Sequence, residues 1–132
     1  MKTADASAQT AVAACNARYA TLAWPPALGI LGMGNDGHTA SLFPGAEGLQ
    51  QALASTAFCA AINARPSAVT GACTERMTLT LSALLQCERV ALLVTGDDKW
   101  QVYQRAKAGE DTALPVSLVL ARAAQVDVFW SP

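Results

Sequence analysis

Two short apolar runs, each closed by a glycine, constrain the fold of this chain more than any other feature. Residues 28–31 are followed by Gly32, and residues 89–95 are followed by Gly96. Runs of this length and apolarity are typical of strands buried on both faces of a parallel sheet. Because parallel strands need a long crossover between them, usually a helix, the chain should alternate strands with helices.

The rest of the chain carries the expected alternation. Apolar residues recur at spacings of three and four between positions 5 and 23, which predicts a helix with Asp5 as its N-cap, ended by Pro25. Met77, Leu79 and Leu81 alternate with polar residues, as in a strand with one buried face. The other expected elements are a turn or two of helix at 39–43, a strand at 57–62, a helix at 82–87, a helix from Asp97 or Asp98 to about 108, and a strand at 126–130.

This order of elements predicts an α/β layer fold with a mostly parallel sheet. The chain has 132 residues, 52% of them apolar and only 14% charged. That composition suits one hydrophobic core, and we expect residues 1–132 to form a single domain.

Charge and hydropathy limit the partners and the location. Nine basic residues against ten acidic ones give a net charge of -1, with no basic cluster of the kind that binds a nucleic-acid backbone. The run at 90–94 is far shorter than the roughly 20 residues that span a bilayer. The first 15 residues lack the continuous apolar core of a signal peptide, because Asp5 and Gln9 interrupt it. We expect a cytoplasmic protein without nucleic-acid or membrane partners.

The four cysteines give no sign of a metal site or of disulfides. They lie at positions 15, 59, 73 and 87, without a CxxC pair and with only one histidine in the chain. We therefore expect no metal, and interpret all four cysteines as small buried hydrophobic residues.

The segment after the first expected strand allows several interpretations. Gly32, Gly34 and Gly37 match the GxGxxG pattern of dinucleotide-binding turns. However, Pro44 ends any following helix early, and residues 52–62 lack the carboxylate that would bind the ribose. The alternative without a site is that three glycines merely permit a sharp turn between two elements.

His38, the only histidine, favours a functional site in this loop. It follows Asp36 and Gly37 at the carboxyl end of an expected parallel strand, where open α/β sheets place their ligands. A neutral imidazole can take a proton from water near neutral pH, and a carboxylate such as Asp36 can fix its tautomer. The amides of residues 34–37, turned inward as a nest, could hold an anionic oxygen. Since no GxSxG motif or nearby cysteine offers a nucleophile, water is the expected one.

Three segments together resemble one enzyme family. The 15 residues LGMGNDGHTASLFPG, at 31–45, closely resemble the signature of 6-phosphogluconolactonases, and ERMTLTLSALL at 75–85 and VTGDDKW at 94–100 resemble the same family in the same order. Glucosamine-6-phosphate deaminases share the fold and the Gly-x-Asp-Gly-His core. Their pattern places a glutamate before the proline, where this chain has Phe43.

The resemblance implies a Rossmann-like, doubly wound sheet and hydrolysis of 6-phosphogluconolactone in the pentose phosphate pathway, without a cofactor. His38 would activate water and Asp36 would orient it. Arg76 and Lys99 match the family's basic positions and are expected near the substrate phosphate, where Arg offers a fork and Lys a point charge. Without the resemblance, both are equally well read as solvated surface residues. The predicted substrate-binding residues are Gly32, Gly34, Asn35, Gly37, Arg76 and Lys99.

The resemblance covers a second half only, because family members are usually nearly twice this length. Half of a doubly wound sheet leaves apolar faces and a strand edge uncovered, so we expect a homodimer that covers them. The alternative to an active lactonase is a catalytically inactive remnant that binds phosphorylated sugars or only self-associates.

Overall fold

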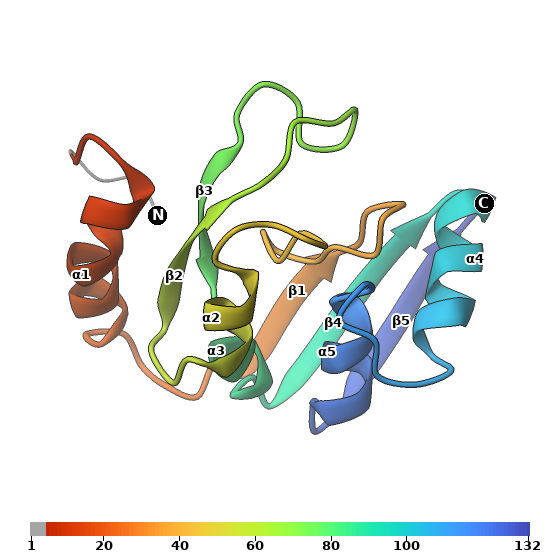
Figure 1. The fold of residues 1–132 in the computed structure, drawn as a ribbon. Coiled ribbons are helices and arrows are strands. Elements are labelled where there is room, and N and C mark those ends of the chain that lie inside the picture. Colours follow the sequence, from red (N-terminus) through yellow and green to blue (C-terminus); the bar gives the residue numbers. More distant parts are fainter. Residues whose placement is uncertain (1–4) are drawn as a thin grey trace.

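The computed structural model describes residues 5–132 and contains two sheets (Figure 1). The larger sheet has the order β1-β4-β5, from β1 (Leu28–Gly32), β4 (Arg89–Thr95) and β5 (Val126–Ser131), and all its strands are parallel. The smaller one pairs β2 (Cys59–Asn63) with β3 (Glu75–Leu79) in antiparallel fashion. The prediction of an α/β fold with a mostly parallel sheet is confirmed, whereas the hairpin was not anticipated.

The strands of the parallel sheet are buried on one face only. Along β4, Val90, Leu92 and Val94 are buried, while Leu93 points to the other face and is 46% exposed. On β1, Leu28 and Ile30 are 50% and 66% exposed. The expectation of strands buried on both faces is therefore wrong for this chain, because all its helices that contact the sheet pack on the same face.

Helix α1 (Ala8–Tyr19) is shorter than the predicted 5–23 and begins differently. Ser7, not Asp5, is its N-cap, and the Ser7 hydroxyl accepts a hydrogen bond from the amide of Thr10. The helix lies beside the hairpin (Figure 1), since the side chain of Asn16 donates to the Cys59 carbonyl and accepts from the Cys59 amide. These two bonds fix α1 to the first residue of β2.

Two helices follow the strands much as predicted. In α3 (Leu81–Leu85), the N-cap Thr80 accepts a hydrogen bond from the amide of Ala83. In α4 (Asp97–Ala106), the N-cap is Gly96, so Asp97 and Asp98 do not cap the helix but lie in its first turn, where a negative charge is favourable. Two more helices, α2 (Leu49–Ala54) and α5 (Val116–Arg122), had no counterpart in the predicted elements, and 39–43 forms turns rather than helix.

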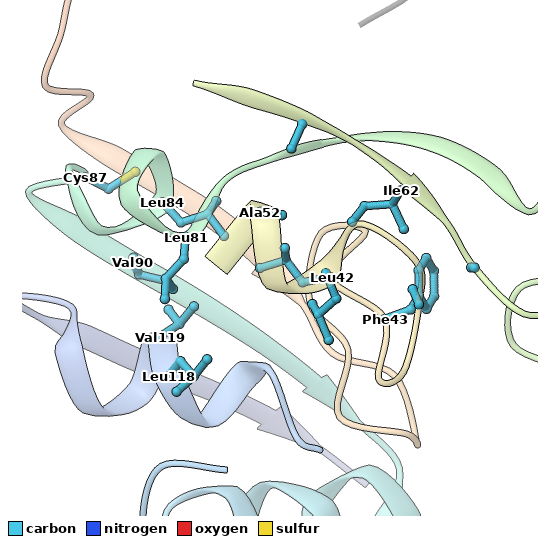
Figure 2. Close-up of a cluster of buried hydrophobic side chains, with 14 residues drawn as sticks. Leu42, Phe43, Ala52, Ile62, Leu81, Leu84, Cys87, Val90, Leu118 and Val119 are labelled. Atoms are coloured by element: carbon cyan, nitrogen blue, oxygen red, sulfur yellow. The ribbon is translucent and has the colours of Figure 1, made fainter. Parts of the chain in front are cut away.

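Helices and sheet enclose two apolar clusters on the covered face. The larger joins Leu42 and Phe43 to α2, β2, α3, β4 and α5, and Figure 2 shows its side chains converging between these elements. The smaller places Val102 and Ala106 of α4 against Leu92 and Val94 of β4. Because α3, α4 and α5 all pack on the same side of β4, no helix within residues 5–132 lies over the opposite side of the sheet.

In the alternating segment, Leu81 is buried as expected, but at 77–80 the buried face is opposite to the expected one. Thr78 is 1% exposed, whereas Met77 and Leu79 are only partly buried. The Thr78 hydroxyl accepts a hydrogen bond from the amide of Ser41 and donates to the Leu79 carbonyl. The buried threonine thus fastens the 39–43 segment to β3, and the polar position of the pattern is the one that faces inward.

Three of the four cysteines are buried, but Cys73 is exposed, so the interpretation of all four as buried residues is wrong at this position. Burial raises the pKa of the Cys59 thiol to about 11, and it also raises the pKa of Cys87. Since the thiolate is the reactive form, the thiols of Cys59 and Cys87 are both inaccessible and rarely ionised.

We therefore expect a thiol reagent at pH 8 to modify one cysteine of the native protein rapidly and all four after unfolding. Cys73→Ser should remove the rapid phase and leave the slow one. Rapid modification of two or more thiols in the native protein would contradict the packing of Cys15, Cys59 and Cys87.

Because the folded pKa of Cys59 is raised, its contribution to stability is present below the ordinary value of 9.0 and is lost as the pH rises through about 11.

Candidate functional site

The glycine-rich loop leaves the carboxyl end of β1 and is held by its own hydrogen bonds. The Gly34 amide donates to the His38 carbonyl at 3.0 Å, and the Gly37 amide donates to the Gly34 carbonyl at 3.0 Å. The Thr39 hydroxyl donates to the carbonyl of Gly32 at 2.9 Å. The Gly37 carbonyl accepts from the amide of Val116, the first residue of α5. The loop is thereby fixed both to β1 and to the start of a helix.

These bonds restrict one expectation about the loop. The amides of Gly34 and Gly37 are used inside the loop, and the His38 amide donates to Asp36 Oδ1 at 3.1 Å. Two of the four amides of the expected nest over residues 34–37 are therefore not available to a ligand. The loop is an anchored turn, and only the amides of Asn35 and Asp36 could still serve such a nest.

His38 and Asp36 form a closely bonded pair, as predicted. Nδ1 of His38 lies 2.6 Å from Asp36 Oδ1. A carboxylate only accepts, so the pairing requires the proton on Nδ1 and leaves Nε2 as the basic nitrogen. Among the described residues, Nε2 has no hydrogen-bond partner, and since every buried side-chain nitrogen or oxygen there has one, Nε2 is accessible. The His38 side chain is 19% exposed.

Two of the three motif glycines are required by the geometry of the loop. A Cβ on Gly34 would lie 2.2 Å from both Cε1 and Nδ1 of His38. Gly37 has a φ of +76°, and a Cβ there would lie 2.6 Å from a side-chain atom of Leu114. Gly32 has nothing within 4 Å of its Cβ position. The reading of the glycines as a mere sharp turn fits Gly37, but Gly34 makes room for the imidazole itself.

A pocket of about 680 Å³ lies where β1 and β4 end. Its lining includes Asn35 and His38 of the loop together with Lys99 from the first turn of α4. Thr95 contributes from the end of β4, and sequence reasoning missed it. The carboxyl ends of adjacent parallel strands share one edge of the sheet, which is why residues over 50 positions apart meet there. His38 and Lys99 therefore line the same pocket.

Arg76 does not line this pocket but lies beside it. Its guanidinium carbon is 5.5 Å from the centre of the Phe43 ring, and that ring is 4.3 Å from the centre of the His38 ring. Nε and Nη2 of Arg76 donate to the carbonyls of Cys73 and Thr70, both at 2.8 Å. Sequence reasoning noticed Phe43 only as the absence of a glutamate, and no periodicity or motif indicated its contact with His38.

Groups of three or more metal-binding side chains are not found within residues 5–132. None of the helices in that range has both the length and the apolar character to cross a bilayer.

A parallel sheet with a histidine loop at its carboxyl edge defines a Rossmann-like α/β protein with its site at the strand ends. Over residues 1–130 the sequence matches the family of glucosamine-6-phosphate isomerases and 6-phosphogluconolactonases. The chain belongs to this family.

Individual relatives agree with this assignment. A 6-phosphogluconolactonase from Rhizobium meliloti is 36% identical over 128 residues, which are 96% of this chain and 54% of the relative. The crystal structure of a 6-phosphogluconolactonase from Shewanella baltica matches with a TM-score of 0.90 at 35% identity, covering 99% of this chain and 55% of that one. A 6-phosphogluconolactonase from Thermotoga maritima, 22% identical with a TM-score of 0.72, covers 93% and 51% and supports the fold alone. The chain spans about half the length of these relatives.

Proposed function

We propose that this chain hydrolyses a 6-phosphosugar lactone, 6-phosphogluconolactone, as a step of the pentose phosphate pathway. The observation that carries the proposal is the His38–Asp36 pair at 2.6 Å beside a pocket that Lys99 also lines. The relatives from Rhizobium meliloti and Shewanella baltica, both over 30% identical, carry the name of this activity.

The proposed mechanism uses the accessible nitrogen of His38 as a general base. Nε2 takes a proton from water, the hydroxide oxygen attacks the lactone carbonyl, and a tetrahedral intermediate forms. The intermediate collapses by breaking the bond between the carbonyl carbon and the ring oxygen, which receives the proton from Nε2. Asp36 holds the imidazole in the required tautomer and stabilises its transient positive charge. The product is the open-chain acid, and no cofactor or metal is needed.

The substrate contacts follow from what lines the pocket. We assign the phosphate to Lys99, which lines the pocket. Arg76 lies beside the pocket, and we assign an assisting role to its Nη1, the guanidinium nitrogen that makes no bond to the carbonyls of Thr70 and Cys73. Charge-assisted bonds of this kind contribute roughly 1.5 to 3 kcal/mol each. We assign to Asn35, which lines the same pocket, the role of a donor to the lactone oxygens. Gly32 lines the pocket without a side chain, which lets the substrate approach the backbone at the end of β1.

The same proposal includes a cytoplasmic location and residues 1–132 as one domain that corresponds to the second half of the family fold. It includes neither nucleic acid nor membrane among the partners. The alternative is a remnant without turnover that binds phosphorylated sugars or only self-associates.

A lactonase assay on the purified full chain, run beside a thermal-shift titration with 6-phosphogluconate, distinguishes the two functions. Turnover above the spontaneous hydrolysis of the lactone supports the enzyme. A rise in the melting temperature without turnover supports the remnant. If neither turnover nor a rise in the melting temperature is observed, self-association is the only activity left for the remnant.

We further propose that a second copy covers the open face of the parallel sheet. That face carries Leu28, Ile30, Leu93 and Phe129, which are 46% to 66% exposed, and its position on a single-layered sheet is typical of an interface. Ile30 and Leu93 also line the pocket, so a partner seated there would close one wall of the site.

Sedimentation should therefore show a dimer at micromolar concentration, and Phe129→Glu should shift it to monomer. Leu22→Glu is the matched control, because Leu22 is 56% exposed and precedes β1 without belonging to the sheet. A folded wild-type monomer at this concentration, or equal effects of the two substitutions, would remove the dimer from the proposal.

A further inference from the structure

Phe43 packs its ring against the imidazole of His38. The ring centres are 4.3 Å apart and the ring planes are inclined by 37°. Phe43 is only 4% exposed and belongs to the larger apolar cluster, where it lies at one end of the group in Figure 2. A side chain packed into the core has little rotational freedom, so the face that it presents to His38 is fixed.

Arg76 is the second neighbour of the Phe43 ring. Its guanidinium carbon lies 5.5 Å from the Phe43 ring centre, within the range of a cation–π contact. Two of its three nitrogens are bonded to the carbonyls of Thr70 and Cys73, which keeps the planar group in place. The arginine is thus part of the structure around the site before any substrate arrives.

The hydrogen bond to Asp36 does not orient the imidazole completely. One bond at Nδ1 fixes one atom of the ring and leaves the ring free to tilt about that bond. Two contacts oppose such tilting, namely the Phe43 ring and the backbone of Gly34, where even a Cβ would lie 2.2 Å from the imidazole. With its plane held, the ring keeps Nε2 in one direction.

We infer that Phe43 is a positioning residue for His38 and that Arg76 acts on His38 through the Phe43 ring. The consequence for catalysis rests on the proposed lactonase function, whereas the consequence for the imidazole does not. A base that is held less firmly loses rate without losing substrate affinity, and a misplacement of about 1 Å costs up to roughly 100-fold. Phe43→Leu should therefore lower kcat by about 10- to 100-fold with little change in KM.

The single histidine of the chain makes the geometry measurable without any activity. The carbon-bound protons of His38 give two resonances that are unambiguous in an NMR spectrum, and the neighbouring aromatic ring displaces both. Phe43→Leu should move them toward the positions of an unstructured histidine, and Phe43→Tyr should restore them together with kcat. Arg76→Lys should move them in the same direction by a smaller amount, because a lysine cannot hold both carbonyls in the same fork geometry.

The matched control is Phe58→Leu, which removes a ring stacked 4.6 Å from Trp24, away from the pocket. At an equal loss of melting temperature it should leave the His38 resonances and kcat unchanged.

Unmoved His38 resonances in Phe43→Leu overturn the inference, as does an equal loss of kcat in Phe58→Leu. If Arg76→Lys raises KM and leaves the resonances in place, the arginine acts on the substrate alone. If the wild type shows no turnover but its His38 resonances still move in Phe43→Leu, the proposed function is refuted and the positioning role of Phe43 is retained.

Discussion

His38→Asn is expected to lower the rate of lactone hydrolysis by roughly 10² to 10⁴, the usual contribution of a general base, while the protein stays folded. Asparagine keeps a polar group that can bond Asp36, but it has no nitrogen that can take a proton from water. The side chain is partly exposed and is not among the core residues, so the packing survives its loss. The measurement is kcat/KM on the purified variant, with circular dichroism to verify the fold.

Asp36→Asn provides a second, independent test of the same pair. An amide at this position can offer its N–H to Nδ1, which would favour the tautomer with the proton on Nε2 and remove the base from the pocket. We expect a loss of kcat comparable to that of His38→Asn, and a double variant no slower than either single one, because the two residues act as a unit. An unchanged rate in His38→Asn would exclude the imidazole from the mechanism.

The parts of the fold that sequence reasoning predicted are those determined locally. The runs at 28–31 and 89–95 become strands because their apolar residues and terminal glycines act over a few positions. The position of His38 followed in the same way, because a loop after a parallel strand always lies at the ligand edge of the sheet. Lys99 was proposed only from the family resemblance, and it lines the same pocket because the neighbouring strand β4 ends at that edge too.

The parts that were missed depend on contacts between distant residues. The hairpin pairs Cys59 with Leu79, twenty positions later, and no turn motif at its tip indicated this register. Thr78 is buried because it bonds Ser41, which a pattern of apolar residues cannot show. The exposed apolar face of the sheet was expected from the length of the family rather than from the apolar pattern. A strand buried on both faces and a strand with one exposed apolar face have similar apolar content, so the pattern does not distinguish them.

Gly34→Ala is expected to displace the His38–Asp36 pair directly. The new Cβ would lie 2.2 Å from Cε1 and Nδ1 of His38 and 2.7 Å from Asp36 Oδ1, closer than any real Cβ contact. Either the imidazole and the carboxylate move apart or the loop shifts, and both outcomes displace the base. We expect a loss of up to roughly 100-fold in kcat and a decrease of about 1 to 3 kcal/mol in the free energy of unfolding.

Gly32→Ala, two residues earlier in the same motif, separates this effect from a general demand for glycine. Its Cβ meets nothing within 4 Å and its φ is not in the left-handed region, so the alanine should keep the His38 resonances in place and change stability by no more than about 1 kcal/mol. The comparison isolates the imidazole, because the two substitutions are chemically identical and only one meets the ring. Should Gly34→Ala leave the His38 resonances where they are, the ring does not lie against this backbone, and the account of Gly34 as space reserved for the base fails.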